Sequence, residues 1–254
     1  MSGPSVPELH APTPWTCIEF ISDLHLNAGD MPTFEAWRRY MAGARCDAVF
    51  ILGDLFDAWV GDDAAAEPGF EADCAEVLRA TARRLPVFFL HGNRDFLVGD
   101  ALMRSTGATL LADPTVLVFE GRRWLLSHGD ALCIGDADYQ AFRRKVRDAA
   151  WQAQFLAQPL GRRREIARGL RGESQERAAS GVEYADVDAA AAVSWLNAAR
   201  AEALVHGHTH HPREHDLGHG FRRIVLSDWD ASAAPPRLQV LRLAGGRFER
   251  LDCA

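Results

Sequence analysis

Long hydrophobic runs are absent from this sequence of 254 residues. No stretch approaches the roughly 20 consecutive apolar residues that a helix needs to cross a bilayer. The first residues, 1–14, also lack the basic segment followed by an apolar segment that is typical of a secretory signal. We therefore expect a cytoplasmic protein that can contact a membrane only at its surface.

Paired cysteines are absent as well. The 5 cysteines are odd in number and widely spaced, and none belongs to a Cys-x-x-Cys motif. This pattern disfavours the disulfide framework found in small secreted domains. It favours free thiols in a reducing compartment, which agrees with a cytoplasmic location.

The chain has no excess of basic residues. Its 28 basic and 35 acidic side chains give a formal net charge of -7, which disfavours general binding of nucleic acid. A hydrophobic content of 48% and a charged content of 25% are typical of a globular protein with an ample core. Because 1–14 is rich in proline, we expect a loose tail there, followed by a single domain over 15–254.

The first third of the chain alternates between two kinds of apolar pattern. Short apolar runs predict strands at 17–22, 48–52 and 87–90. Apolar residues at helical spacing predict helices at 31–43 and from Phe70 to Leu85. This alternation predicts an α/β fold in which parallel strands are joined by helices.

The remainder of the chain does not continue this alternation of strands and helices. Two apolar segments, 115–119 and 123–127, flank Gly121 and predict a hairpin. From residue 138 the short apolar runs typical of strands are missing and arginine is frequent. This pattern predicts a helical insertion at about 138–182. A further helix is expected at 186–200. Strand-like segments follow it at 203–206, 221–227, 237–243 and 247–251.

The start of the insertion predicts one helix with two apolar faces. Tyr139 and Phe142 begin one stripe, while Trp151 and Phe155 lie about 120–160° away around the helix. Burial between the core and a neighbouring helix explains the second face, and contact with lipid explains it equally well. Both explanations are kept open.

Five short polar fragments each follow a predicted strand. They are Asp23-Leu24-His25, Gly53-Asp54, Gly92-Asn93-Arg94-Asp95, His128-Gly129-Asp130 and Gly207-His208-Thr209-His210. Any one of them is compatible with an ordinary turn, because Gly, Asn and Asp favour turn geometry. In open α/β sheets, however, ligands bind beyond the carboxyl ends of the strands. We therefore expect the five fragments to meet at one point.

The fragments supply oxygen and nitrogen ligands but no thiolate, which suits Mn²⁺, Fe²⁺ or Zn²⁺. Their seven candidate ligands are enough for two ions about 3.5–4 Å apart, bridged by a carboxylate such as Asp54. Such a pair lowers the pKa of a shared water and holds both oxygens of an in-line displacement. Phosphorus esters and anhydrides are the natural substrates. The acidic pair Asp62-Asp63 is interpreted as structural.

The five fragments resemble those of the calcineurin-like metallophosphoesterase superfamily. Longer segments narrow the resemblance to its UDP-2,3-diacylglucosamine hydrolase family, which acts in lipid A biosynthesis. These segments run from Ile51 to Asp63, His91 to Leu97, His128 to Cys133 and Tyr139 to Arg143. The resemblance spans about 16–230. It implies a sandwich of βαβ-built sheets flanked by helices, with a helical cap insertion.

The resemblance also implies a reaction. The family hydrolyses UDP-2,3-diacylglucosamine to UMP and 2,3-diacylglucosamine 1-phosphate, by attack of water on the α-phosphorus. It implies an enzyme peripheral to the cytoplasmic face of the inner membrane, with two Mn²⁺ per chain. The implied ligands are Asp23, His25 and His210 for one ion, Asn93, His128 and His208 for the other, and Asp54 between them.

Further roles are implied for residues near the ligands. Catalytic roles fall on Asp54, Asn93 and Arg94, and the implied substrate contacts are Asn93, Arg94, Asp136, Ser174 and His208. The family's Asn and Lys align on Ala178 and Gly181, so the contacts at 175–185 are left open.

Most members of the superfamily carry a histidine, often assigned as a proton donor, where this chain has Arg94. Arginine cannot donate a proton near neutral pH, but its fork can bind a phosphate oxygen and offset developing charge. This suits a leaving group that is itself a phosphate. We expect Asp95 to orient the Arg94 guanidinium.

Other functions are less favoured. A related two-metal phosphoesterase that acts on a soluble nucleotide or a phosphoprotein is disfavoured by the two-faced helix and by the tryptophan motif at 56–60. A binding protein with a degenerate site would lack a ligand, and all seven are present. A nuclease is disfavoured by the acidic charge and by the lack of aromatic residues among basic ones near the ligand fragments.

Overall fold

The structure is a computed structural model that describes the backbone of 6–179 and 185–253, and the side chains of 6–172 and 185–253. Three apolar runs form the centre of one sheet, as β2 (Cys17–Ile21), β3 (Ala48–Leu52) and β4 (Val87–Leu90). They pair in parallel, and every residue of β3 and β4 is buried. Burial on both faces explains why these runs are continuously apolar. The predicted parallel strands are confirmed.

Within the described residues, nine further strands complete two sheets. They are β1 (Glu8–His10), β5 (Thr109–Leu111), β6 (Thr115–Phe119), β7 (Arg122–Leu126), β8 (Ala203–His206), β9 (Glu214–Gly218), β10 (Phe221–Val225), β11 (Gln239–Ala244) and β12 (Arg247–Asp252). One sheet has the order β12-β11-β2-β3-β4-β5, and the other has the order β1-β6-β7-β8-β10-β9. Strands β7, β8 and β10 are parallel neighbours in the second sheet.

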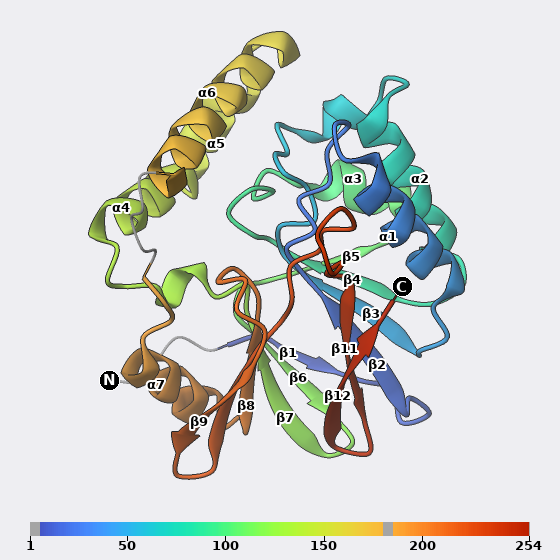
Figure 1. The fold of residues 1–254 in the computed structure, drawn as a ribbon, viewed down its shortest axis with the longest axis vertical. Helices are drawn as coiled ribbons and strands as arrows, with labels where there is room; N and C mark the ends of the chain where they lie inside the picture. Colours follow the sequence, from blue (N-terminus) through green and yellow to red (C-terminus); the bar gives the residue numbers. More distant parts are fainter. Residues whose placement is uncertain (1–5, 180–184, 254) are drawn as a thin grey trace.

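The two sheets pack face to face and helices cover their outer faces (Figure 1). Large side chains such as Phe20, Phe50 and Trp124 are completely buried between the sheets. Each such side chain contributes about 1.5–3 kcal/mol of hydrophobic free energy. The helices of the first sheet are α1 (Met31–Gly43), α2 (Phe70–Ala82) and α3 (Asp100–Thr106), and α7 (Ala189–Ala199) covers the second. The predicted sandwich of sheets flanked by helices is confirmed.

Helices between 137 and 179 form a cap, which projects from one end of the sandwich (Figure 1). They are α4 (Ala137–Val146), α5 (Ala149–Leu156) and α6 (Leu160–Ala179), and they fall within the predicted insertion. Two short one-turn helices, η1 (Asp62–Ala65) and η2 (Asp130–Leu132), lie in loops near this end. In the described parts of the chain, no helix has the length and apolar character needed to span a bilayer.

The prediction of one continuous helix with two apolar faces is wrong. The Asp148 side chain accepts a hydrogen bond from the Trp151 backbone N–H at 2.9 Å and begins a new helix, α5. Phe155, on this second helix, is buried against the core of the first sheet, and Trp151 stacks on it with ring centroids 5.2 Å apart. Burial therefore explains the second apolar face.

The prediction of a loose tail over 1–14 is wrong for β1. This strand pairs in parallel with β6, and the Val116 backbone N–H donates to the Pro7 carbonyl at 2.8 Å. An edge strand needs hydrogen bonds on one side only, so flanking prolines are compatible with it. The Arg123 side chain reinforces the strand through Glu8, with Nη2 and Oε1 2.7 Å apart.

Candidate two-metal centre

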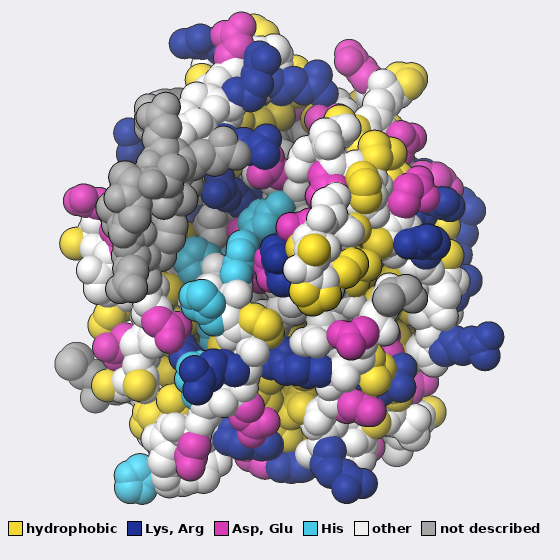
Figure 2. Space-filling view, viewed as in Figure 1, with side chains coloured by type: hydrophobic (Ala, Val, Ile, Leu, Met, Phe, Trp, Pro, Cys, Tyr) yellow, Lys and Arg dark blue, Asp and Glu magenta, His cyan; other side chains and the backbone are white. Residues whose placement is uncertain are grey.

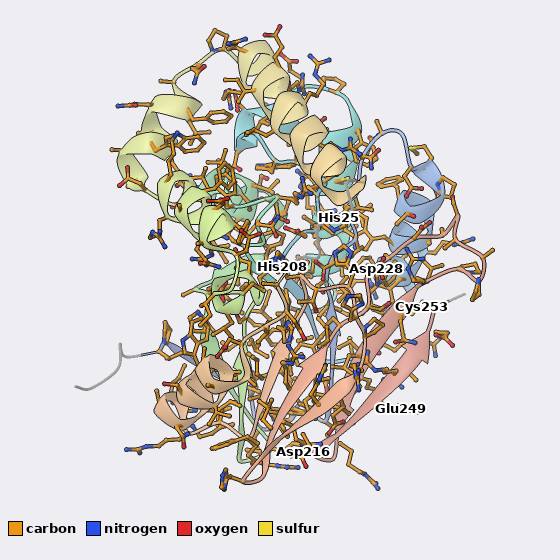
Figure 3. The ribbon with its side chains drawn as sticks, turned by 60° about the vertical axis from the view of Figure 1, so that its left-hand side comes forward. His25, His208, Asp216, Asp228, Glu249 and Cys253 are labelled. Carbon is orange, nitrogen blue, oxygen red and sulfur yellow. The ribbon has the colours of Figure 1, made fainter. Side chains whose placement is uncertain are left out.

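The candidate ligands lie where parallel strands of both sheets end. Asp23 and His25 follow β2, Asp54 follows β3, Asn93 follows β4, His128 follows β7, and His208 and His210 follow β8. Figure 2 shows histidine side chains gathered in a hollow near the middle of one face. Figure 3 shows His25 and His208 between the sheets and the cap, with Asp216 and Glu249 far away. The fold therefore brings together the fragments that the sequence separates.

The first cluster consists of Asp23, His25 and His210. The His25 Nε2 and His210 Nε2 atoms are 3.2 Å apart, and His210 Nε2 lies 3.4 Å from Asp23 Oδ1. One ligand atom from each of the three residues lies within 4.8 Å of the other two. These are the three residues assigned to one ion from the sequence, and their role as ligands stays a prediction.

The second cluster forms around the amide oxygen of Asn93. This Oδ1 lies 2.8 Å from His208 Nδ1 and 3.0 Å from His128 Nε2. The carboxylate of Asp54 is adjacent, with Oδ2 3.6 Å from His128 Nε2. Asp23, Asp54 and His128 also offer ligand atoms within 4.8 Å of one another. Asp23 thus belongs to both groups, a central position that the sequence pattern predicted for Asp54 alone.

Backbone strain is concentrated on these residues. Five of the seven candidate ligands have a positive φ, which costs a side-chain-bearing residue about 1–3 kcal/mol. They are Asp23 (56°), His25 (48°), Asp54 (51°), His208 (68°) and His210 (53°). Such strain persists only where the surrounding structure imposes it, and it commonly marks functional sites.

Close approach of two loops adds a further constraint at Gly53. Its φ is +90°, and a Cβ atom there would lie 2.6 Å from the Gly92 backbone N and 2.6 Å from His128 Nδ1. Only glycine tolerates both the dihedral angle and the contact. The Gly-Asp fragment therefore lets the loops that carry Asp54 and Asn93 lie against each other.

Burial and charge together shift the pKa values of the cluster. Burial opposes ionisation of Asp23, but the His210 and His128 imidazoles outweigh it and lower its pKa. Burial raises the pKa of Asp54. It lowers the pKa of His208 to about 3. Burial acts in the same direction on His128, but the Asp54 and Asp23 carboxylates outweigh it and raise its pKa to about 9.

These observations fit a pair of divalent cations. Buried carboxylates carry negative charge that a cation would neutralise, and the donors are oxygen and imidazole nitrogen. The His25 and His210 nitrogens face each other beside the Asp23 carboxylate, as ligands of a common ion do. The donor set suits several first-row metals and does not select one.

The structure also shows where some of the predicted catalytic and substrate-binding residues lie. The Arg94 backbone N–H donates to Asp54 Oδ1 at 2.8 Å. Asp136 accepts a hydrogen bond from the Tyr139 N–H at 3.0 Å and begins α4. The side chain of Ser174 and the residues compared at 175–184 lie outside the described side chains.

The expectation that Asp95 orients the Arg94 guanidinium is wrong. The Asp95 carboxylate instead accepts backbone hydrogen bonds from Gly92 at 2.7 Å and Leu55 at 2.8 Å. It joins the Asn93 loop to the Asp54 loop. The Leu55 amide follows a different strand from Asp95, so a local sequence pattern does not reveal this contact.

Sequence reasoning also missed a contact between the cap and the ligand loop of His128. Asp130 Oδ2 accepts hydrogen bonds from the Tyr139 hydroxyl and from Arg143 Nε, each at 2.7 Å. The Tyr139 ring lies 5.8 Å from the His208 ring. The available signal was the segment Tyr139 to Arg143, which carried the family resemblance without an assigned role.

Comparison with known proteins agrees with this geometry. The profile of the family described as Calcineurin-like phosphoesterase matches residues 18–212. The chain belongs to this family. A dimetal phosphatase from Danio rerio has a similar fold, with a TM-score of 0.50 at 13% identity, covering 93% of this chain and 95% of that chain.

Relatives within the calcineurin-like phosphoesterase family confirm the narrower resemblance. The UDP-2,3-diacylglucosamine hydrolase of Bordetella pertussis is 45% identical over 224 residues, which cover 85% of this chain and 87% of that protein. The protein of the same name from Escherichia coli O81 is 42% identical over 216 residues, covering 83% of this chain and 90% of that protein.

Proposed function

We propose that this chain hydrolyses the pyrophosphate bond of UDP-2,3-diacylglucosamine, releasing UMP and 2,3-diacylglucosamine 1-phosphate in lipid A biosynthesis. The observation that carries the proposal is the convergence of seven ligand-type side chains in a chain that is 45% and 42% identical to proteins named for this activity. A coincidental cluster would not explain this identity over at least 83% of both chains.

The proposed cofactor is two Mn²⁺ per chain. Asp23, His25 and His210 would hold one ion and Asn93, His128 and His208 the other, with Asp54 between them and Asp23 also within reach of the second ion. When bound, the ions supply hydroxide at neutral pH and Lewis acidity toward the phosphate oxygens. The mixed oxygen and nitrogen donors, with no thiolate among them, support a pair of divalent first-row ions.

The chain's own residues would bind and orient the pyrophosphate. The Arg94 backbone is held on both sides, because its N–H donates to Asp54 Oδ1 and its carbonyl accepts from the Trp59 N–H at 3.0 Å. Its guanidinium would bind a phosphate oxygen and offset charge in the transition state. A sugar 1-phosphate leaves as a stable anion, so a group that cannot donate a proton suffices. Asn93, His208, Asp136 and Ser174 complete the proposed substrate contacts.

The cap would receive the acyl chains and the membrane surface. Among the side chains that the structure describes, four of the five exposed large apolar ones lie between 134 and 170. They are Ile134, Phe142, Leu156 and Leu170, exposed by 54%, 37%, 41% and 41%. Arginines of α6 lie among them, as on surfaces that meet anionic lipid. We propose a cytoplasmic enzyme, peripheral on the inner membrane.

The test measures UMP release by metal-stripped protein, with and without Mn²⁺, in water enriched in ¹⁸O. We expect release that depends on Mn²⁺ and one ¹⁸O atom in the UMP, because water attacks the α-phosphorus. Asp54→Asn should abolish release, whereas the exposed Glu249→Gln should not. Hydrolysis of a generic phosphodiester without UMP release would contradict the substrate assignment and favour a soluble nucleotide or phosphoprotein substrate.

A further inference from the structure

The side chain of Arg163 joins the cap to a loop beside the metal centre. It lies on α6 and is only 3% exposed. Its Nε donates to the Gln158 carbonyl at 2.9 Å, and its Nη1 donates to Asp63 Oδ1 at 2.9 Å and also to the Val60 carbonyl. Its Nη2 donates to Asp63 Oδ2. The planar fork of arginine is required to reach these acceptors together.

The cap packs closely against Gly61, which lies in the same loop as Asp63. A Cβ atom there would lie 2.9 Å from Asp63 Oδ1, 2.9 Å from Leu156 Cδ2 of α5, and closer still to Arg163 Nη1. Its φ of +128° also disfavours any side chain. Glycine at this position therefore allows α5 and α6 to rest on the loop. This observation is independent of the hydrogen bonds.

The loop is in turn attached to the segment that carries Arg94. Asp62 Oδ1 accepts hydrogen bonds from Trp59 Nε1 and from the Gly99 N–H, each at 3.0 Å. The Trp59 backbone N–H donates to the Arg94 carbonyl at 3.0 Å. A continuous series of contacts thus leads from α6 to the backbone of Arg94. The Asp62-Asp63 pair is structural, as the sequence analysis interpreted it.

Other arginines on α6 make weaker connections. Arg171 pairs with Asp57 at 2.8 Å and Arg164 with Glu71 at 3.3 Å, but these arginine side chains are 39% and 41% exposed. Exposed pairs contribute little to stability, whereas removal of one partner from a buried pair is costly. Asp63 is itself 56% exposed, but the Arg163 side chain is 3% exposed and also donates to the carbonyls of Val60 and Gln158, which would lose this donor in its absence. Arg163 is therefore the main attachment of α6.

We propose that Arg163 is a positioning residue, which holds the cap in a fixed place over the metal centre and so sets the affinity for the acylated part of the substrate. This inference rests on the proposed function, because the acyl chains are taken to bind under the cap. The Arg163 guanidinium is taken up by Asp63 and by the carbonyls of Val60 and Gln158, so its role is to position the cap. Its loss should loosen the cap and leave the metal centre intact.

Three variants test this inference with two readouts, hydrogen exchange and kinetics. Arg163→Ala and Gly61→Ala should each make the backbone amides of 160–172 exchange about tenfold faster, with no change in β3. They should raise the KM for UDP-2,3-diacylglucosamine about tenfold, with unchanged metal content and unchanged hydrolysis of bis(p-nitrophenyl) phosphate. The matched control is Arg162→Ala, since Arg162 is 61% exposed and, among the described side chains, forms an ion pair with Glu165 of its own helix.

The results of these experiments can overturn either the attachment of the cap by Arg163 or its role in substrate affinity. Exchange in Arg163→Ala no faster than in Arg162→Ala would overturn the attachment, and faster exchange with an unchanged KM would overturn its role in substrate affinity. Arg163→Lys, which retains the charge but loses the fork, should give intermediate values and provides a test if the alanine variant fails to fold. A wild-type chain that does not release UMP would contradict the proposed function, but the exchange comparison would still test the attachment.

Discussion

The imidazole rings of His25 and His210 face each other with their Nε2 atoms 3.2 Å apart, although 185 positions separate them in the sequence. One follows β2 of the first sheet and the other follows β8 of the second. The candidate metal centre therefore exists only when the two sheets are packed together. Folding of the sandwich and assembly of the site are the same event.

We expect substitution of Asp23 to remove more metal than substitution of His25, because Asp23 lies between the two groups of candidate ligands. Because Asp23 belongs to both groups of candidate ligands, Asp23→Asn should remove both ions. His25 belongs to one group, so His25→Ala should retain about one ion per chain. Elemental analysis of dialysed protein measures both values. Equal metal content in the two variants would contradict the central place of Asp23.

The charge on His128 predicts how metal affinity changes with pH. Without metal its pKa is raised to about 9, so at neutral pH the imidazole is protonated and a cation must displace the proton. Affinity should rise about tenfold per pH unit for this proton, up to a pH near its pKa. Calorimetry in buffers of different ionisation enthalpy counts the protons released. In His128→Asn the count should fall by about one, and an unchanged count would refute the assignment.

Arg94 should be needed for turnover and dispensable for metal binding. Its backbone contacts to Asp54 and Trp59 survive in Arg94→Ala, so the loop should keep its place. Loss of one charged group that stabilises the transition state lowers kcat by about 10²–10³. Steady-state kinetics and metal analysis should be measured on the same preparation. Loss of metal in this variant would instead assign Arg94 a structural role.

The pair of Asp186 and Arg223 predicts a dependence of stability on pH. Asp186 accepts two hydrogen bonds, at 2.7 and 2.8 Å, from a guanidinium that is 4% exposed. The Arg223 hydrogen bond, larger in effect than the opposing burial, lowers the pKa of Asp186 to about 2. Because this value is below the ordinary pKa of about 3.9, the stabilisation is complete above pH 4–5 and is lost as the pH falls toward 2.

Asp186→Asn should therefore lower the free energy of unfolding by about 1–2 kcal/mol at pH 7, since the carboxylate is partly exposed and screened. The difference from wild type should shrink as the pH falls toward 2. Urea unfolding of metal-stripped protein at several pH values measures it. A difference that stays constant across this range would exclude the pair as its origin.

Exposed apolar residues of the cap should govern membrane binding. Phe142→Ser with Leu170→Ser should weaken binding to vesicles that contain anionic lipid, because both side chains are exposed and available to insert. The Tm should change little, since neither side chain fills the core. Met31→Ser is the matched control, as Met31 is 45% exposed on α1, outside the cap. Equal loss of vesicle binding in the control would remove the special role of the cap.

Local signals in the sequence were sufficient for the elements with strong patterns. The continuous apolar runs of β3 and β4 identified strands buried on both faces, and α1 has the bounds that its helical spacing predicted. The weaker elements were missed. Strand β9 is an edge strand with largely polar residues, and α3 and β5 are short, so their patterns do not differ from those of loops.

The sequence by itself determined which kinds of side chain follow each strand, and that was enough to predict a two-metal phosphoesterase. Only the tertiary structure decided that Asp23 lies in both groups, that Asp95 binds the Leu55 amide, and that Asp148 divides the cap. It also decided that Arg163 is buried against Asp63. Asp148 accepts a hydrogen bond at the start of α5 and so separates α4 from α5. Apolar spacing alone does not distinguish one long helix from two short ones. The other three features depend on the distances and the burial of residues far apart in the chain, which periodicity and motif spacing do not encode.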